Sequence, residues 1–174
     1  EYSQQLKQKI DTTLADYGKE AQKLDQTFPQ RLLNQGVIAA EAQQIEADLK
    51  QIENKQRLYQ KLGLIDVQPA LVQGLDQLAE NSPVKIAAMT VYITDMKQKL
   101  AVLDSLANRV NLLLSLINEK FTDKKLYVDK HHELAIRTSH CDEISVTALS
   151  SGEQHQIVLA YDMLFSIEPN ALVM

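Results

Sequence analysis

The chain has 174 residues, a formal net charge of −5 and a hydrophobic content of 45%. This composition excludes a disordered chain and argues against general attraction to nucleic acid or anionic lipid, although a local basic patch stays open. Cys141 is the single cysteine, so an internal disulfide is excluded and a reducing compartment is expected. We recognise no signal peptide and no apolar run long enough for a bilayer, and we therefore expect a cytoplasmic protein with no membrane partner.

Residues 1 to about 121 carry the apolar spacing of helices. The first stripe recurs at steps of three and four, and consists of Leu6, Ile10, Leu14, Tyr17, Ala21, Leu24 and Phe28. Pro29 is expected to end or kink this helix. A second helix is expected to end at Gly63, with a stripe made of Ile45, Leu49, Ile52, Tyr59 and Leu62.

The third long helix has the most regular pattern in the chain. Asn81-Ser82-Pro83 predicts its start, with Ser82 as the cap, and a short helix is expected before it, at about residues 70–80. Its stripe repeats without a break as Ile86, Met89, Ile93, Met96, Leu100, Leu103, Ala107, Val110, Leu114, Ile117 and Phe121. At ~1.5 Å per residue the helix spans roughly 55 Å. Both a helical bundle and an antiparallel coiled-coil arm fit this heptad pattern.

Beyond Phe121 the period changes to that of strands. Residues 125–129, 133–138 and 144–147 predict a small antiparallel sheet. A capping box formed by Ser150 and Glu153 then predicts a helix start, whose free N–H groups favour an anion. Gly152 allows close approach of a ligand. The following helix, residues 153–167, is apolar nearly all round and is expected to be buried on several sides, before a turn and a strand at residues 171–174.

We therefore predict a mainly α fold: a long antiparallel helical or coiled-coil hairpin over residues 1–121, then a small α/β portion over residues 122–174. Glu1 already lies in a helical pattern and residues 171–174 read as a strand core, so we expect a fragment of a longer protein.

The stretch Leu149-Ser150-Ser151-Gly152-Glu153-Gln154 resembles the signature motif of ABC-type ATPases in the form used by the SMC, RecF and OLD-like branch. Residues 121–174 resemble the C-terminal lobe of those heads. Residues 28–33, Phe-Pro-Gln-Arg-Leu-Leu, resemble a stretch in AAA-family ATPases with a helical insertion, of the kind found in anti-phage defence systems such as Septu and some retrons.

The resemblance implies that two heads pair around ATP, as a homodimer or higher oligomer. Ser150 would contact the γ-phosphate through its hydroxyl and Gly152 through its N–H, while Glu153 and Gln154 would anchor the loop. Ser151 stands where the transporter form has glycine. Mg²⁺ ligands would follow the strand at residues 171–174, and no Gly-Lys-Ser or Gly-Lys-Thr segment is present. We expect ATP hydrolysis by the full-length protein, with no catalytic residue in this segment and no activity of the segment alone.

Other interpretations of the sequence stay open. The parent protein could act with a nuclease effector or nucleic acid in defence, or in DNA repair or chromosome maintenance, or the segment could be a purely structural coiled-coil oligomerisation module. A metal site is weighed and disfavoured, because adjacent pairs of ligand residues point to opposite faces of a strand; these pairs are His131-His132 and His140-Cys141. His155 is expected to pack, or to support the residues that contact the ligand, rather than to act as a base. Four lysines form a basic cluster that is more simply a solvated turn, namely Lys120, Lys124, Lys125 and Lys130.

Overall fold

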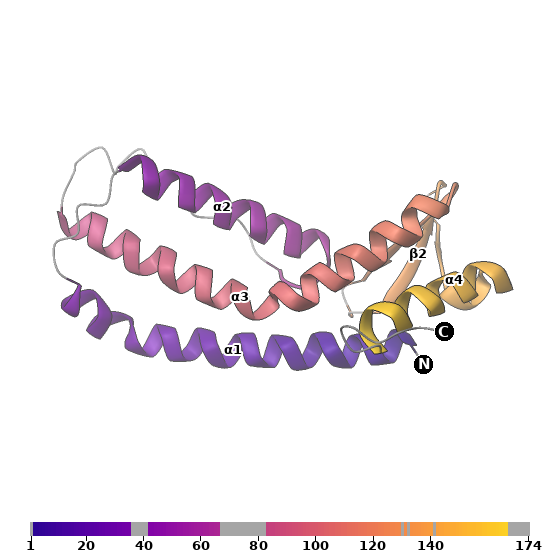
Figure 1. Cartoon of the computed structure of the whole chain (residues 1–174), viewed down its shortest axis with the longest axis horizontal. Helices are drawn as coiled ribbons and strands as arrows, with labels where there is room; N and C mark the ends of the chain where they lie inside the picture. Colours follow the sequence, from indigo (N-terminus) through magenta and orange to yellow (C-terminus); the bar gives the residue numbers. More distant parts are fainter. Residues whose placement is uncertain are drawn as a thin grey trace. The chain divides into compact units, whose positions relative to one another are not determined.

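The computed structural model describes residues 2–35, 42–66, 83–129, 131, 133–140 and 142–166. Its long helices are α1 (Tyr2–Asn34), α2 (Ala42–Lys61) and α3 (Pro83–Lys120), and a shorter helix, α4 (Ser151–Tyr161), follows the strands (Figure 1). The strands are β1 (Lys124–Val128), β2 (Leu134–Thr138) and β3 (Glu143–Ile144). The predicted fold, mainly helical with a small antiparallel sheet after the long helices, is confirmed. The helix expected near residues 70–80, the cap Ser82 and the strand at residues 171–174 lie outside the described residues.

The chain packs as two compact units, and the division runs through α1 and α3. The helical unit comprises Thr13–Lys61 and Ile65–Asp104. The sheet unit comprises Glu1–Thr12, Leu62–Leu64 and Ser105–Met174. The domain boundary expected at residue 121 stays a prediction.

In the helical unit, α3 lies between α1 and α2 (Figure 1). Two ion pairs join α1 to α3 in antiparallel order, because Asp25 pairs with Lys99 at 2.7 Å and the later Arg31 pairs with the earlier Asp95. This is the antiparallel hairpin expected from the heptads. The stripe of α3 here is buried as predicted at Ile93, Met96, Leu100 and Leu103.

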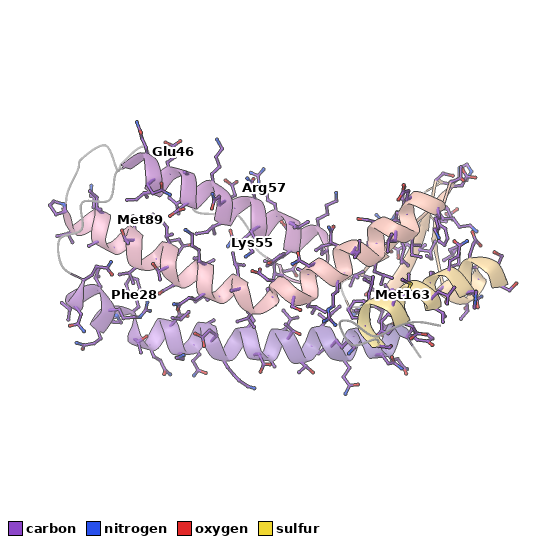
Figure 2. All side chains as sticks on the ribbon, viewed as in Figure 1. Phe28, Glu46, Lys55, Arg57, Met89 and Met163 are labelled. Atoms are coloured by element: carbon purple, nitrogen blue, oxygen red, sulfur yellow. The ribbon has the colours of Figure 1, made fainter. Side chains whose placement is uncertain are left out.

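Helix α2 joins α3 in the parallel sense. Lys97 pairs with Asp48 at 2.9 Å, and Asp104, further along α3, pairs with Lys55 at 2.6 Å. Figure 2 shows Lys55 on the side of α2 that faces α3, and the exposed Arg57 on the opposite side. The helical unit therefore contains three packed helices. This favours a helical bundle over a coiled-coil arm of two helices.

Pro29 does not end α1, which continues to Asn34. A proline lacks the amide hydrogen that a helix needs at that position. The carbonyl that loses its amide donor is that of Asp25. In the same turn, Thr27 Oγ1 and Arg31 Nη2 donate to the neighbouring carbonyl of Leu24, at 3.3 and 2.6 Å. Arg31 also anchors the last turn to α3 through Asp95. Of the two outcomes expected at Pro29, the helix end is therefore not observed, and the kink stays a prediction.

The sheet unit is built on the order β1-β2-β3, with antiparallel neighbours. Leu126 and Ile136 face each other in the register and are fully buried. At the outer edge of β1, the side chain of Asn118 accepts from Leu126 N at 2.6 Å and donates to Leu126 O at 2.9 Å. The amide thus stands where a further strand would pair.

The third expected strand is shorter than predicted. Only Glu143–Ile144 pairs with β2, and a 3₁₀ turn, η2 (Val146–Ala148), follows soon after. The hydroxyl of Ser145 accepts a hydrogen bond from Thr147 N at 3.3 Å. This local bond competes with the ladder, so β-branched residues alone predicted too long a strand.

Helix α4 is less buried than its apolar composition predicts. Ile157 and Tyr161 are buried, and so is Phe165 in the π-helical turn η3 (Asp162–Ser166) that continues it. Tyr161 packs edge-on to Tyr2 and stacks on Phe165. On the outer face, however, Leu159 is 50% and Met163 66% exposed, so burial on several sides is not observed.

By length and composition alone, one helix of the described part of the chain, α3, could cross a membrane. Of its most apolar 18-residue window, 44% is buried. Charged residues interrupt the helix, which is why the sequence alone does not suggest a span there. A core helix of a soluble protein meets the same criteria, so the finding is weak evidence for a span and the structure is compatible with a soluble protein.

Candidate anion-binding turn at the start of α4

The capping box predicted at Ser150 and Glu153 is confirmed. Ser150 has an extended backbone, with φ −60° and ψ 155°, and its Oγ accepts a hydrogen bond from Glu153 N at 3.3 Å. The Glu153 carboxylate accepts in return from Ser150 N at 2.9 Å. These two bonds satisfy main-chain donors on both sides of the helix start and fix the direction in which α4 begins.

The next two residues leave their main chain open to solvent. Ser151 and Gly152 are both exposed, and their N–H groups have no hydrogen-bond partner among the described residues. A Cβ added at Gly152 would meet nothing within 4 Å. The first turn of α4 therefore presents free donors and the positive end of a helix dipole on an accessible surface.

Glu153 is also held by Lys124, which comes from β1. Lys124 Nζ lies 2.8 Å from Oε1 and 3.1 Å from Oε2 of the carboxylate. The hydrogen bond from Lys124, with further bonds from the hydroxyl and N–H of Ser150, lowers the pKa of Glu153 to about 2. The carboxylate is therefore ionised at any physiological pH.

Ser150 also donates its hydroxyl hydrogen inside the chain. Ser150 Oγ lies 2.8 Å from Glu153 Oε2 and donates to it. Oε2 thus receives three donors: Ser150 N, Ser150 Oγ and Lys124 Nζ. To donate to any external ligand, the hydroxyl must first turn away from the carboxylate.

Gln154 fastens the turn to the residues that precede it. Its Nε2 donates to Leu149 O at 2.8 Å and to Thr147 O at 3.2 Å. Leu149 is 5% exposed and fixes the loop to the core of the sheet unit. The structure thus brings the five predicted site residues, Ser150 to Gln154, into one ordered turn; their binding of a nucleotide stays a prediction.

The histidine and cysteine pairs show no metal centre in the part of the chain that the structure describes. There, no three side chains of the types that bind metals come together. His131 and His140 lie exposed in turns, and His132 and Cys141 lie outside the described residues. His155 is exposed on α4, so packing, one of the two roles expected for it, is not observed.

The four lysines of the predicted basic cluster do not share one partner. Lys124 pairs with Glu153, while Lys125 Nζ donates to the main-chain carbonyl of Asn118 at 3.3 Å. Lys120 is exposed at the end of α3, and Lys130 is not described. The sequence alone places Lys124 in a solvated turn; only the pairing of β1 with β2 and the path of the chain to α4 could have revealed its partner 29 residues away.

A groove of about 430 Å³ lies between α2 and α3 in the helical unit. Its lining includes Ile45, Ile93 and the ion-paired Asp48 and Lys97. None of the predicted site residues lines it, so it gives no support to the nucleotide prediction.

No protein-family model matches the chain, and no curated protein matches it either. The candidate site therefore stands on its own geometry and on the resemblance of its motif.

Proposed function

We propose that this chain is the signature-bearing part of an ABC-type ATPase head with a helical insertion, and that the turn from Ser150 to Gly152 binds the terminal phosphate of ATP held by a second head. The full-length protein would bind ATP with Mg²⁺ and hydrolyse it in the cytoplasm. Nucleotide binding would join two heads and hydrolysis would release them.

The observation that carries the proposal is the accessibility of the turn. A buried turn could not meet a second subunit, but Ser150, Ser151 and Gly152 are all exposed. Gly152 has open space around the position of an added Cβ, so packing within the described chain does not demand a glycine there. A glycine at that position has a physical use when an external group approaches the main chain closely.

The insertion would carry the motion of the heads to a partner. Helices α1 and α3 enter both compact units, and in the proposed function they are the elements along which a displacement of the heads would pass. In the proposed function the partner is a nuclease effector or nucleic acid acting in anti-phage defence.

The test is a Ser150→Arg substitution in the full-length protein. Arginine fills the space in front of the first turn and removes the hydroxyl, so ATP-dependent pairing of heads and ATP turnover are expected to be lost. Ser139→Arg is the matched control, because Ser139 is an exposed serine in the turn between β2 and β3.

Analytical ultracentrifugation with and without ATP measures pairing, and phosphate release measures turnover. Unchanged turnover in the Ser150→Arg protein contradicts the proposal. An oligomer that forms equally with and without ATP, in wild type and variant alike, would instead identify a structural oligomerisation module.

A further inference from the structure

The helix start that would receive a phosphate also carries a carboxylate. Glu153 lies in the first turn of α4 and its Oε2 accepts from Ser150 N, so the cap requires this side chain to be near the anion site. An unpaired carboxylate there would repel a phosphate and cancel the attraction of the helix dipole. The site therefore needs a group that keeps Glu153 in place and compensates its negative charge.

Lys124 supplies the opposite charge. Its Nζ bonds both carboxylate oxygens, at 2.8 and 3.1 Å, and the side chains of the pair are only 30% and 26% exposed. Partial burial weakens screening by solvent and salt, so the compensation is stronger than for a fully exposed pair. With the pair neutral, the free N–H groups of Ser151 and Gly152 dominate the field in front of α4.

Lys124 also lowers the cost of releasing the Ser150 hydroxyl from Glu153. That hydroxyl donates to Glu153 Oε2, and it must leave this oxygen to reach a phosphate. When it leaves, Oε2 keeps its bonds from Ser150 N and Lys124 Nζ. The carboxylate thus remains satisfied, and release of the hydroxyl costs less than it would without the lysine.

We propose that Lys124 is a positioning residue of the nucleotide site: it neutralises and satisfies Glu153, and thereby frees the Ser150 hydroxyl and the first-turn N–H groups of α4 for the terminal phosphate. The inference rests on the proposed function. It adds a residue on β1, outside the signature motif, on which binding in trans depends.

The experiment uses the full-length protein with four variants at the pair, and ultracentrifugation over a range of ATP concentrations. Lys124→Met is expected to raise the ATP concentration needed for head pairing at least tenfold, and Lys124→Arg to restore it. Glu153→Gln retains a group that can accept from Ser150 N but carries no charge. The double variant Lys124→Met/Glu153→Gln is therefore expected to need less ATP than Lys124→Met alone.

Lys125→Met is the matched control, because this neighbouring lysine is exposed and, among the described residues, bonds a main-chain carbonyl rather than Glu153. It is expected to pair like wild type. If Lys124→Met does not fold, as judged by its thermal unfolding, Lys124→Gln replaces it in the same comparison.

The outcomes separate the two proposals. If wild type pairs with ATP, Ser150→Arg does not, and Lys124→Met pairs like wild type, the role of Lys124 is overturned while the proposed function stands. The role of Lys124 is also overturned if Glu153→Gln gives no relief in the double variant, since the lysine would then not act through the carboxylate. If wild type shows no ATP-dependent pairing, both proposals fall.

Discussion

The ion pair between Arg31 and Asp95 gives the sharpest test of how the helical unit is held together. Asp95 is only 5% exposed at its side chain, and both of its carboxylate oxygens accept from the guanidinium of Arg31. Arg31 also donates to Leu24 O at 2.6 Å beside the proline turn. Replacing Arg31 by methionine keeps the aliphatic stem but leaves a buried carboxylate without its cation.

Removing one partner of a buried ion pair costs about 3–5 kcal/mol, because the remaining charge is desolvated and uncompensated. Arg31 is 31% exposed, so water can reach part of the vacated space. We therefore expect the lower end, about 3 kcal/mol. For a chain of this size that loss corresponds to a fall in Tm of roughly 6–12 °C.

Urea unfolding and thermal unfolding of Arg31→Met measure the effect, with Arg57→Met as the control. Arg57 pairs with Glu53 four residues earlier on α2; the arginine side chain is 64% exposed and the glutamate side chain 18%. Such a pair contributes less than about 0.5 kcal/mol. Equal stability of the two variants would refute the reasoning, because it would show that burial of Asp95 does not make its partner important. The double variant Arg31→Met/Asp95→Leu is expected to recover most of the loss.

Three further predictions concern other sites. Gly63→Ala is expected to lose about 2 kcal/mol in urea unfolding, because Gly63 has φ 71° and a Cβ would lie 2.8 Å from Val128 O; wild-type stability would contradict this. Leu103→Ala, at a fully buried position, is expected to lose about 3 kcal/mol, and Leu112→Ala, 46% exposed, less than about 1 kcal/mol; similar losses would contradict the packing described. The third prediction concerns Glu153, whose pKa is lowered from 4.5 to about 2 by Lys124 and by the hydrogen bonds of the cap. The stability that ionised Glu153 contributes is therefore complete above pH 4.5 and is lost as the pH falls toward 2. The difference in Tm between wild type and Glu153→Gln should shrink over that range, and a constant difference would contradict the lowered pKa.

The features that sequence reasoning predicts well are those set by neighbours within one or two turns. The heptad positions of α3 and the stop at Gly63 follow from spacing and from the left-handed conformation that glycine adopts easily. The capping box at Ser150 and Glu153 likewise joins residues three apart. For these features the chemistry can be read along the chain without knowledge of the fold.

The features that sequence reasoning misses depend on residues distant in the chain. The proline predicts an end or a kink of α1 at Pro29, but the helix continues, and Arg31 reaches Asp95, 64 residues away, beyond the proline. The lysine cluster predicts a solvated Lys124, whereas this residue meets Glu153 across 29 residues. No periodicity encodes such partners, because several charged residues could equally well have supplied each one.

The exposed face of α4 shows a different limit of prediction from sequence. Its composition predicts burial on several sides, yet Leu159 and Met163 lie at the surface of the described chain. An apolar residue can be read from the sequence, but the element that covers it cannot.

The side chain of Asn118 has a consequence for how the protein behaves in concentrated solution. The edge of a sheet normally offers a row of unpaired main-chain groups to which a strand of another molecule can add. At the centre of β1 both such groups, the N–H and the C=O of Leu126, are already bonded to one amide on α3. A foreign strand would have to displace that amide before it could pair with the centre of β1, so this side chain opposes strand addition at that point of the edge.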